Sequence, residues 1–310
     1  MHRSIRRLQL AVAIVVAAAC TQEASPPAPS PPVREEAFPV TVEDDEGVEV
    51  TLDAEPRRLV TFAPSNTEIV FALGLGDRLV GVAGEFDDHP PQARDIERVG
   101  GAGEFGVDPN VERVVELEPD LMLAAFPGGE WKDRLRELGI PVFTILAEDL
   151  DDALADIETV GALTGAGEEA EALTATMRAE AEEATAGIDQ RVTCFFEVGF
   201  EGGFFTVGPG SFIYDLLERA GCDPVTAEAT DPFPQWSVEA LVEADPDAYL
   251  VSSESGGTPQ EVAERPGFEA LSAVRDGRVV LIDSDLVSRP GPRVVEGLRE
   301  LVAALHAPVD

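Results

Sequence analysis

The chain has 310 residues, 44% of them hydrophobic, so it is long enough to bury the cores of two ordinary domains. It carries 60 Asp and Glu against 22 Lys and Arg, a net charge of −38, and Lys132 is the only lysine. Such a surface repels phosphates and anionic lipids, which argues against nucleic-acid binding and against membrane docking through a basic face. The three histidines, His2, His89 and His306, lie far apart in the sequence, so no metal site is predicted.

The N-terminus has the pattern of an export signal. Arginines precede the apolar run Leu8–Ala19, which is too short to span a bilayer comfortably, and residues 1–19 are predicted to be a signal peptide. The residues before Cys20 resemble the lipobox of bacterial lipoproteins, in which the cysteine is lipidated; a plain secretory signal with an incidental cysteine is the alternative. Residues 20–37 are rich in Pro, Ser and Ala and predict an extended tether. We therefore expect an exported protein that is lipid-anchored on the outer face of the cytoplasmic membrane or in the periplasm.

Residues 38–165 read as a first α/β lobe. The segments FPVTV and VEVTL alternate around the acidic turn 44–47 and predict a β-hairpin. RRLVTFAP predicts a strand that leads into the helix IVFALGLG, which either Ser65 or Asn66 could cap. Strands and helices continue to alternate through RLVGVAG and DRLRELGIPVFTI, which is the pattern of a parallel sheet.

One helix–strand unit occurs twice in the chain. NVERVVELEPDLML, residues 110–123, recurs as SVEALVEADPDAYL at residues 237–250. Each copy opens on polar residues that can cap a helix, Asp108-Pro109-Asn110 in the first and Ser237 in the second. Apolar positions on one side follow, and a proline ends the helix before a buried strand. Two copies predict two similar lobes with a ligand site between them.

The pattern changes after Asp149. LDDALADIETVGALTG predicts an amphipathic helix that breaks at residues 165–167, and the Ala- and Glu-rich segment after it has no internal Gly or Pro. We assign residues 166–190 to a long connecting helix and 191–310 to a second α/β lobe; an ordinary surface helix is the alternative to a connector. Cys194 and Cys222 lie in the second lobe, and the sequence leaves open whether they pair or remain two buried thiols.

Several of these segments together resemble a known family. TLDAEPRRLVTFAPSNTEIVFALGLGDRLVGV, PNVERVVELEPDLML and WSVEALVEADPDAYLV are similar to segments of the class III substrate-binding proteins of ABC importers, which carry cobalamin, ferric siderophores or haem. The likeness runs from about Phe38 to the C-terminus. It implies an α/β fold of two Rossmann-like lobes joined by a single long rigid α-helix. It also implies a monomer whose partners are an ABC permease with its ATPase, and no cofactor besides the transported cobalamin or ferric chelate.

Within this family the strongest likeness is to the cobalamin-binding member, which implies a set of cleft residues. The implied aromatic positions are Phe86 in EFDDHPP, Phe205 (or Phe204) in GGFFTVGPGSFI, Phe233 in DPFPQWSVEAL, and Phe105 in a longer loop at 100–106. The implied polar positions are Asp285 and Arg289 in SDLVSRPGPR. Phenylalanines stand where the relative has tyrosine and tryptophan, and this departure leaves room for a different ligand preference. For each of these residues the structural alternative is a core phenylalanine or a solvated surface charge.

Glu112 and Glu239 occupy equivalent places in the two repeats. Each falls in the first turn of its predicted helix, where the helix dipole favours a carboxylate, and this preference alone would explain both residues. The resemblance implies more, because the matching glutamates of the family meet arginines on the permease, one per lobe. We expect Glu112 and Glu239 to dock this protein on its transporter.

The predicted function is capture and delivery of a corrinoid, without chemistry on it. A ferric-siderophore or haem carrier is the alternative, although an anionic siderophore would need more basic residues than Arg289 and Arg293. An exported enzyme on a similar scaffold is a remote alternative. The sequence has no G-x-S-x-G, no H-E-x-x-H and no histidine beside a nucleophile, so we predict that the protein is not an enzyme.

Overall fold

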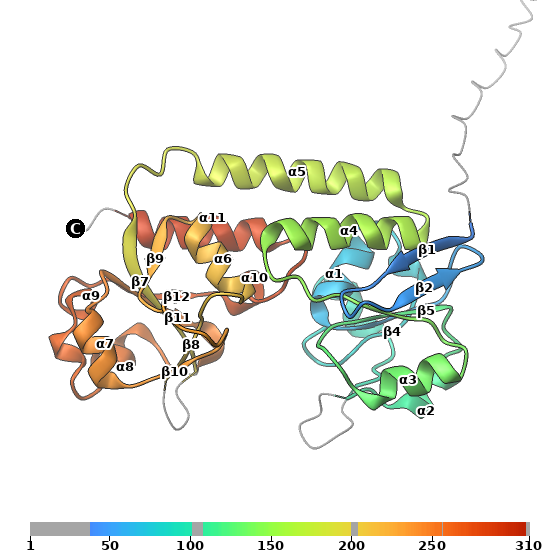
Figure 1. Ribbon diagram of the computed structural model, residues 1–310, viewed down its shortest axis with the longest axis horizontal. Coiled ribbons are helices and arrows are strands. Elements are labelled where there is room, and N and C mark those ends of the chain that lie inside the picture. Colours follow the sequence, from blue (N-terminus) through green and yellow to red (C-terminus); the bar gives the residue numbers. More distant parts are fainter. Residues whose placement is uncertain (1–37, 101–107, 200–203, 256, 308–310) are drawn as a thin grey trace, which may run out of the picture. The chain divides into compact units, whose positions relative to one another are not determined.

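The computed structural model describes residues 38–100, 108–199, 204–255 and 257–307. All of them belong to one compact unit, Glu36–Asp310. Within it, two α/β lobes are joined by a single long helix, as the resemblance implied (Figure 1). No helix among these described residues is long and apolar enough to cross a bilayer.

The first lobe is built on a four-stranded parallel sheet in the order β4-β3-β5-β6. An antiparallel hairpin precedes this sheet and confirms the predicted turn at residues 44–47. The elements of this lobe are β1 (Val40–Glu43), β2 (Glu49–Leu52), β3 (Leu59–Phe62), α1 (Pro64–Ala72), β4 (Leu79–Gly81), α2 (Val111–Glu116), β5 (Leu121–Ala124), α3 (Glu130–Glu137) and β6 (Val142–Thr144).

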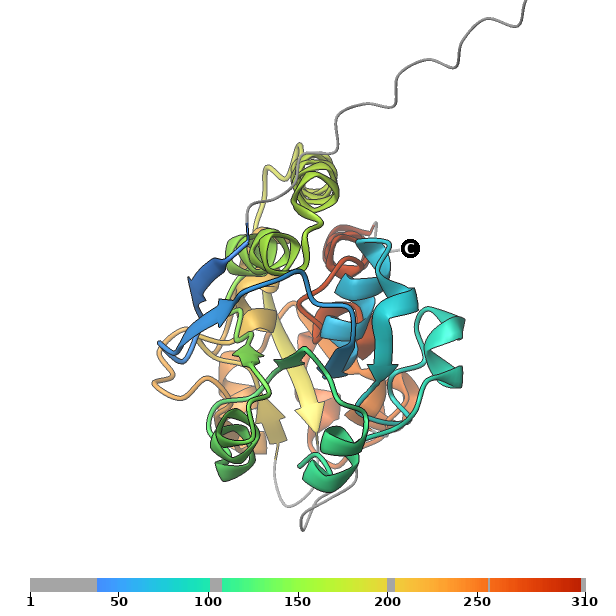
Figure 2. The same ribbon diagram turned by 90° about the vertical axis from the view of Figure 1, so that its right-hand side faces the viewer.

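Two consecutive helices lie between the two α/β patterns of the chain, and the second of them joins the lobes. The first, α4 (Leu150–Thr164), is capped by Asp149 and ends at Gly165, whose φ of 74° is the left-handed conformation in which glycine carries no penalty. The second, α5 (Gly167–Thr185), confirms the long helix between the two α/β patterns. Figure 2 shows α5 outermost, lying over α4 and the last helix, α11 (Val294–His306). Gly161 permits the close approach of α4 to α5, because a Cβ there would lie 2.4 Å from Ala170 Cβ.

The second lobe has a mixed sheet in the order β10-β8-β7-β11-β12, with β9 paired to β7. Strands β7, β9, β11 and β12 are parallel, whereas β8 and β10 run antiparallel to their neighbours, which the purely parallel pattern did not predict. The elements are β7 (Val192–Gly199), β8 (Phe204–Thr206), α6 (Phe212–Arg219), β9 (Cys222–Pro224), β10 (Gln235–Trp236), α7 (Val238–Ala244), β11 (Ala248–Ser252), α8 (Pro259–Ala263), α9 (Ser272–Arg275), β12 (Val279–Ile282), α10 (Ser284–Val287) and α11.

Each sheet packs against a hydrophobic core on both of its faces. Alternate residues of a strand point to opposite faces, so in β5 Leu121 and Leu123 enter one core while Met122 enters another. The first of these cores is shared: it also holds Met177 of α5 and Leu250 of β11. The opposite face of the first sheet is covered by α2 and α3, and that of the second sheet by α7 and α8.

The two repeats adopt the same structure. Ser237 accepts a hydrogen bond from the backbone N–H of Ala240, which confirms the predicted cap. In the first copy the cap is Asn110, the last residue of the predicted polar opening, which accepts from the backbone N–H of Arg113. The repeated aspartates make equivalent hydrogen bonds through Oδ2. Asp120 accepts hydrogen bonds from the backbone N–H groups of residues 57 and 58 before β3, and Asp247 accepts one from the backbone N–H of residue 193 in β7. The repeat therefore fixes corresponding positions in the two lobes.

The predicted cap of the first helix is wrong. Helix α1 begins at Pro64, its N-cap is Ala63, and no side chain caps it. Proline at the first helical position has its φ already set and lacks the N–H that a cap would satisfy. Ser65 and Asn66 lie inside the first turn and are buried.

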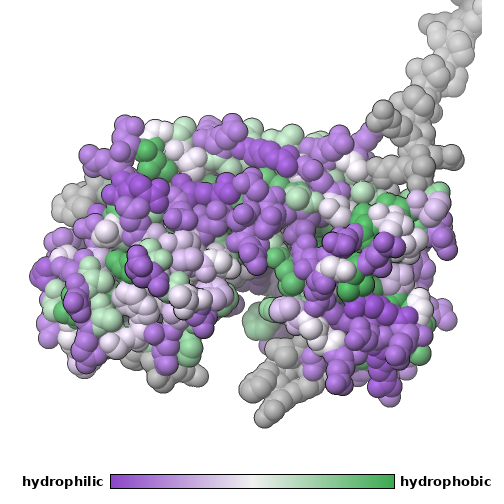
Figure 3. All heavy atoms as spheres, in the orientation of Figure 1, coloured by the Kyte–Doolittle hydropathy of each residue, from purple (hydrophilic) through white to green (hydrophobic). Residues whose placement is uncertain are grey.

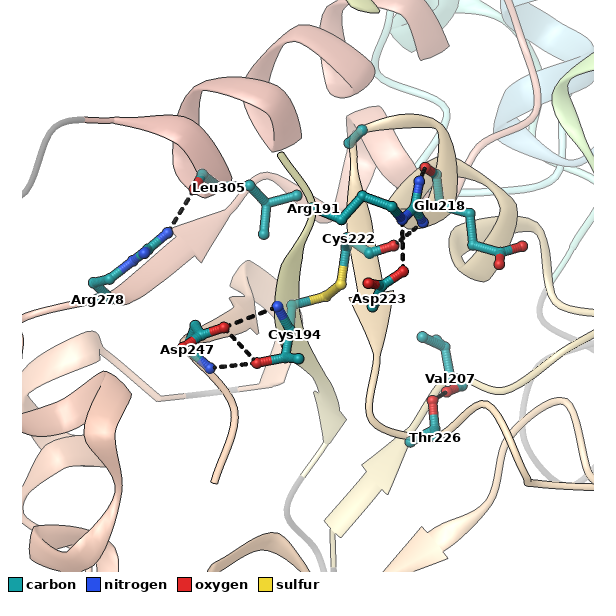
Figure 4. Close-up of a disulfide and its surroundings, with 12 residues drawn as sticks. Arg191, Cys194, Val207, Glu218, Cys222, Asp223, Thr226, Asp247, Arg278 and Leu305 are labelled. Carbon is teal, nitrogen blue, oxygen red and sulfur yellow. Dashed lines mark hydrogen bonds and ion pairs between the residues drawn. A yellow bond between two sulfur atoms is a disulfide. The ribbon is translucent and has the colours of Figure 1, made fainter. Parts of the chain in front are cut away.

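Cys194 and Cys222 form a disulfide, which answers the question that the sequence left open. Their Cα atoms are 5.8 Å apart and the bond closes a segment of 28 residues between the paired strands β7 and β9 (Figure 4). Arg191 supports the same junction, because its Nε donates to Asp223 Oδ1 at 2.5 Å. A loop of this length stabilises the folded state by roughly 3–4 kcal/mol in the chain-entropy account.

Asp156 of α4 makes the stability of the fold depend on pH. Its side chain is buried, and its Oδ2 has no hydrogen-bond partner among the described residues. Burial, together with the charges of Asp45 and Asp152, raises the pKa of Asp156 from 3.8 to about 7. Because the folded-state pKa lies above the unfolded one, the folded state loses stability as pH rises from about 4 to about 7.

We expect Asp156→Asn to stabilise the protein by roughly 2–4 kcal/mol at pH 8 and by less than half of that at pH 5. The amide removes the charge that burial penalises. Denaturant unfolding at the two pH values measures the difference. Asp189→Asn, at an exposed site, is the control and should change the free energy of unfolding by less than about 0.5 kcal/mol at either pH. An equal gain from Asp156→Asn at both pH values would contradict the prediction.

Candidate functional site

A cleft of about 820 Å³ is lined by residues of both lobes. In the first lobe its walls are the segments that follow three parallel strands: 63–65 after β3, 125–127 after β5 and 145–148 after β6. The carboxyl ends of parallel strands meet at one edge of a sheet, which is where α/β proteins bind ligands. The other lining residues are Phe86, the segments 210–212 and 288–290, Phe233 and Glu254. Figure 3 shows a recess at the lower edge of the molecule with apolar side chains at its margin.

Phenylalanines form much of the cleft surface. Phe86 and Phe233, both singled out from the sequence, line the cleft and are 63% and 53% exposed. Phe205 is exposed on β8 but does not line the cleft, and its alternative Phe204 is buried in the core. Phe105 lies outside the described residues. The structure therefore brings two of the predicted aromatic side chains to the cleft.

The loop that carries Phe86 is held by its neighbour Asp87. The buried Asp87 carboxylate accepts a hydrogen bond from Thr67 of α1 and, through Oδ2, one from the backbone N–H of Gly84 at 2.8 Å. Burial raises the pKa of Asp87, while these hydrogen bonds and the charge of Arg289 act in the opposite direction. The aromatic residue at the cleft thus directly precedes an anchored residue.

Arg289 reaches the cleft with its charge already compensated. Its Nη2 donates to Asp285 Oδ1 at 2.5 Å and its Nη1 to Glu68 Oε1 at 3.3 Å. Arg293 binds the same Glu68, with Nε to Oε2 at 2.8 Å and Nη2 to Oε1 at 2.6 Å, and hydrogen bonding to this carboxylate raises the pKa of Arg293. Glu68 belongs to α1 of the first lobe and is 3% exposed, so the network joins the two lobes. The predicted pair Asp285 and Arg289 is in contact. The positive charges of Arg289 and Arg293 are balanced by the negative charges of Asp285 and Glu68.

Phe126 of the cleft and Glu68, the partner of Arg289, were not singled out from the sequence. Phe126 lines the cleft and is 66% exposed, but it sits in a short Pro-Gly-Gly loop that resembles no motif we used. Phe126 has a positive φ of 68°, which is unusual for a bulky residue. A phenylalanine in the sequence gives no sign of this conformation. Glu68 was missed because it is one of 60 Asp and Glu residues of the chain and no local pattern distinguishes it.

Glu112 and Glu239 lie in the first turns of α2 and α7, both exposed. Val114 of α2 and Leu241 of α7 pack on the faces of the two sheets that α5 does not cover. The two glutamates are therefore at corresponding places on the two lobes, on the side away from α5. Cys20, the predicted lipidation site, lies outside the described residues.

The cleft offers little to a metal ion. Among the described residues, no three His, Cys, Asp or Glu side chains are grouped so that they could hold one. The described lining contains no His, Tyr, Cys or Met, and its charged residues are Glu148, Glu254 and the compensated Arg289. The described cleft surface is therefore mostly apolar with a slight excess of negative charge.

Comparison with known proteins places this geometry among relatives. The profile of the periplasmic binding protein family matches residues 59–286. The chain is 32% identical over 307 residues to an uncharacterised ABC transporter substrate-binding lipoprotein of Bacillus subtilis strain 168. The alignment covers 96% of this chain and 95% of the relative. The chain is also 33% identical, over an alignment of 324 residues, to a cobalamin-binding protein of Halobacterium salinarum. This alignment covers 99% of this chain and 86% of the relative.

Solved structures share the fold. The periplasmic vitamin B12 binding protein of Vibrio cholerae matches with a TM-score of 0.70 and 25% identity, over 80% of this chain and 96% of that one. A periplasmic haem-binding protein from Roseiflexus sp. RS-1 matches with a TM-score of 0.71 and 25% identity, over 80% and 97%. Because similar folds hold different ligands, the cargo has to be argued from the cleft itself.

Proposed function

Because this chain belongs to the periplasmic binding protein family, we propose that it captures cobalamin or a related corrinoid between its lobes and delivers it to the permease of an ABC importer. The observation that carries the proposal is the cleft: a wide, mostly apolar recess lined by exposed phenylalanines at the carboxyl ends of the strands. Aromatic faces supply a large contact area to a planar macrocycle at little cost in entropy. The cobalamin-binding relative in Halobacterium salinarum supports the same choice.

The charges of the cleft favour a corrinoid over the alternative cargoes. A siderophore or haem with free carboxylates would need an uncompensated cation, whereas Arg289 is held by Asp285 and Glu68. Haem iron is usually bound by His, Cys, Met or Tyr, and none of these is among the described lining residues. The side arms of a corrinoid end in neutral amides, which donate hydrogen bonds to carboxylates such as Glu148 and Glu254 at the cleft.

The rest of the proposal concerns anchoring and docking. The family and the lipoprotein relative place the protein outside the cytoplasm, and we propose that Cys20 carries the lipid that keeps it at the membrane. As a monomer it would present Glu112 and Glu239 to arginines of the permease, one on each lobe, and release its cargo when ATP is hydrolysed. It would carry the ligand without chemistry, so it would be no enzyme and hold no resident cofactor.

The test is a titration of residues 38–310, the soluble part, with cobalamin while the fluorescence of Trp131 and Trp236 is followed. We expect saturable quenching at low concentration, beyond the absorbance of the ligand itself. Phe86→Ala and Phe233→Ala should each lower the affinity by roughly 3- to 10-fold, the worth of one aromatic contact. Leu138→Ala removes an equally exposed apolar side chain outside the cleft and should leave binding unchanged.

Three outcomes are informative. Saturation by haem or a ferric hydroxamate, without a response to cobalamin, would keep the transport role and overturn the ligand. Equal affinity of the phenylalanine variants and wild type would place the ligand elsewhere. No response to any of these compounds would contradict the proposal and reopen the question of an enzyme.

A further inference from the structure

The loop after β5 presents Phe126 to the cleft in an unfavourable backbone conformation. Its φ is 68°, in the left-handed region that bulky residues rarely occupy, and its ring is 66% exposed. Gly128 and Gly129 follow, also with positive φ. Such a conformation persists only where the surrounding contacts enforce it, and in known proteins it is concentrated at ligand-binding and active sites. The contacts that enforce it here come from outside the cleft.

Lys132, the only lysine of the chain, makes the first of these contacts. Lys132 is 2% exposed, and its Nζ donates to the backbone carbonyl of Phe126 at 2.7 Å. The same Nζ donates to Glu46 Oε2, also at 2.7 Å. A buried ammonium group is stable only when it is paired and hydrogen-bonded, so this side chain ties the carbonyl of Phe126 to the tip of the β1–β2 hairpin.

Glu46 completes the attachment. Its Oε1 accepts from the backbone N–H of Gly128, and its Oε2 accepts from Thr144 Oγ1 at 2.9 Å as well as from Lys132. Burial opposes the charge of Glu46, but the hydrogen bonds from Lys132, Gly128 and Thr144 prevail and lower its pKa. Glu46 therefore holds the Phe126 loop from both sides, through the N–H of Gly128 and through Lys132.

The neighbouring residues of the turn hold a second cleft wall. Asp44 Oδ2 accepts from the backbone N–H of Thr144 at 3.2 Å, and Asp45 Oδ2 accepts from that of Leu146 at 2.5 Å. Leu146 lines the cleft, while Asp44, Asp45 and Glu46 do not. Three consecutive acidic residues thus fasten both the segment after β5 and the segment after β6.

We propose that the acidic turn of the β1–β2 hairpin, acting through Glu46 and Lys132, positions Phe126 for ligand binding. Glu46 and Lys132 are positioning residues, since neither lines the cleft. The hairpin lies outside the four-stranded sheet and adds no strand to it. Its role is to hold the cleft walls in their binding arrangement before the ligand arrives, which saves the free energy that ordering them would cost. The inference rests on the proposed function only in taking this cleft as the ligand site.

The experiment is a double-mutant cycle between Lys132→Met and Phe126→Ala, with cobalamin affinity measured in all four proteins. Methionine keeps the apolar stem of the lysine and removes its donors. We expect Lys132→Met to weaken binding roughly tenfold in the wild-type background and by less than about twofold when Phe126 is already alanine. A residue that merely stabilises the fold would weaken binding equally in both backgrounds. Glu49→Gln, an exposed carboxylate on the same hairpin, is the control and should bind as wild type does.

Circular dichroism establishes that each variant is folded. If Lys132→Met does not fold, Glu46→Gln takes its place, because it keeps the shape of the side chain while it removes the charge and replaces one of the two acceptor oxygens by a donor NH2. Equal losses in the two backgrounds, or unchanged affinity of folded Lys132→Met, would overturn the proposal. If the wild-type protein binds haem or a ferric hydroxamate instead of cobalamin, the proposed function fails, while the same cycle with that ligand still tests the positioning role.

Discussion

Uptake of the cargo is expected to stop when Glu112 and Glu239 are both replaced by arginine, while the affinity of the soluble protein for its ligand stays unchanged. The two residues occupy the same place in the two repeats, each in the first turn of an exposed helix. Neither lines the cleft, so the substitutions leave the ligand contacts intact. Reversing both charges would set arginine against arginine on the permease, and like charges that meet at an interface cost several kcal/mol.

Uptake of labelled cobalamin by cells that produce each variant, together with titration of the purified protein, separates docking from binding. Glu168→Arg with Glu169→Arg makes the same change in charge on α5 and should support normal uptake. Reversing the matching arginines of the permease should restore uptake to the double variant. Normal uptake by the variant with arginine at both positions 112 and 239 would show that the repeated glutamates only stabilise their helices.

Removal of the Glu197 carboxylate is expected to cost about 3–5 kcal/mol of folding free energy, the largest effect on stability that we foresee for one side chain. Glu197 is fully buried on β7 and binds both terminal nitrogens of Arg265, at 2.5 and 3.0 Å. It also accepts a hydrogen bond from Tyr249, and burial together with the charge of Glu197 raises the pKa of that tyrosine. The Arg265 guanidinium lies 5.9 Å from the centre of the Phe204 ring and 5.6 Å from that of Phe268.

Glu197→Ala removes the carboxylate that binds the partly buried Arg265 guanidinium and leaves the buried Tyr249 hydroxyl without this acceptor, which is why the cost is high. Denaturant unfolding of Glu197→Ala measures it. Glu180→Ala breaks an ion pair with Arg299 in which both side chains are more than 40% exposed, and it should cost less than about 1 kcal/mol. A variant with Glu197 and Arg265 both replaced by methionine should recover much of the loss. A loss below 1 kcal/mol in Glu197→Ala would mean that water reaches this site.

Local sequence rules were sufficient for the hairpin, for the alternating strands and helices of the first lobe and for the two repeated units. The two repeats predicted α2–β5 and α7–β11, the cap Ser237 and the polar opening 108–110 that holds the cap Asn110, because a cap and the helix that it begins are neighbours in the chain. The break before α5 was visible in the two glycines that flank Ala166 for the same reason. The cap of α1 was missed because a proline at the first helical position makes a side-chain cap unnecessary.

The architecture of the cleft could not be predicted in this way. Lys132 meets Glu46 across 86 positions of sequence, and Arg293 meets Glu68 across 225. Such pairs form only once the sheet edges have been assembled, and neither partner has a local pattern that marks it. The antiparallel strand β10 was hidden for a similar reason, because it is two residues long and is defined by its pairing with β8. The boundaries of the lobes and the roles of the cleft residues remain predictions.

The core that holds Leu121, Met177 and Leu250 belongs to both lobes at once. No plane divides this unit into two halves that each keep an intact interior, so neither half is expected to survive alone if the chain is cut between them. Heating should therefore melt the protein in one step, and damage in either lobe should lower the resistance of the whole to proteolysis. A carrier with one shared core is expected to change its conformation little when the ligand binds. The free energy that releases the ligand would then have to come from the transporter on which the carrier is proposed to dock.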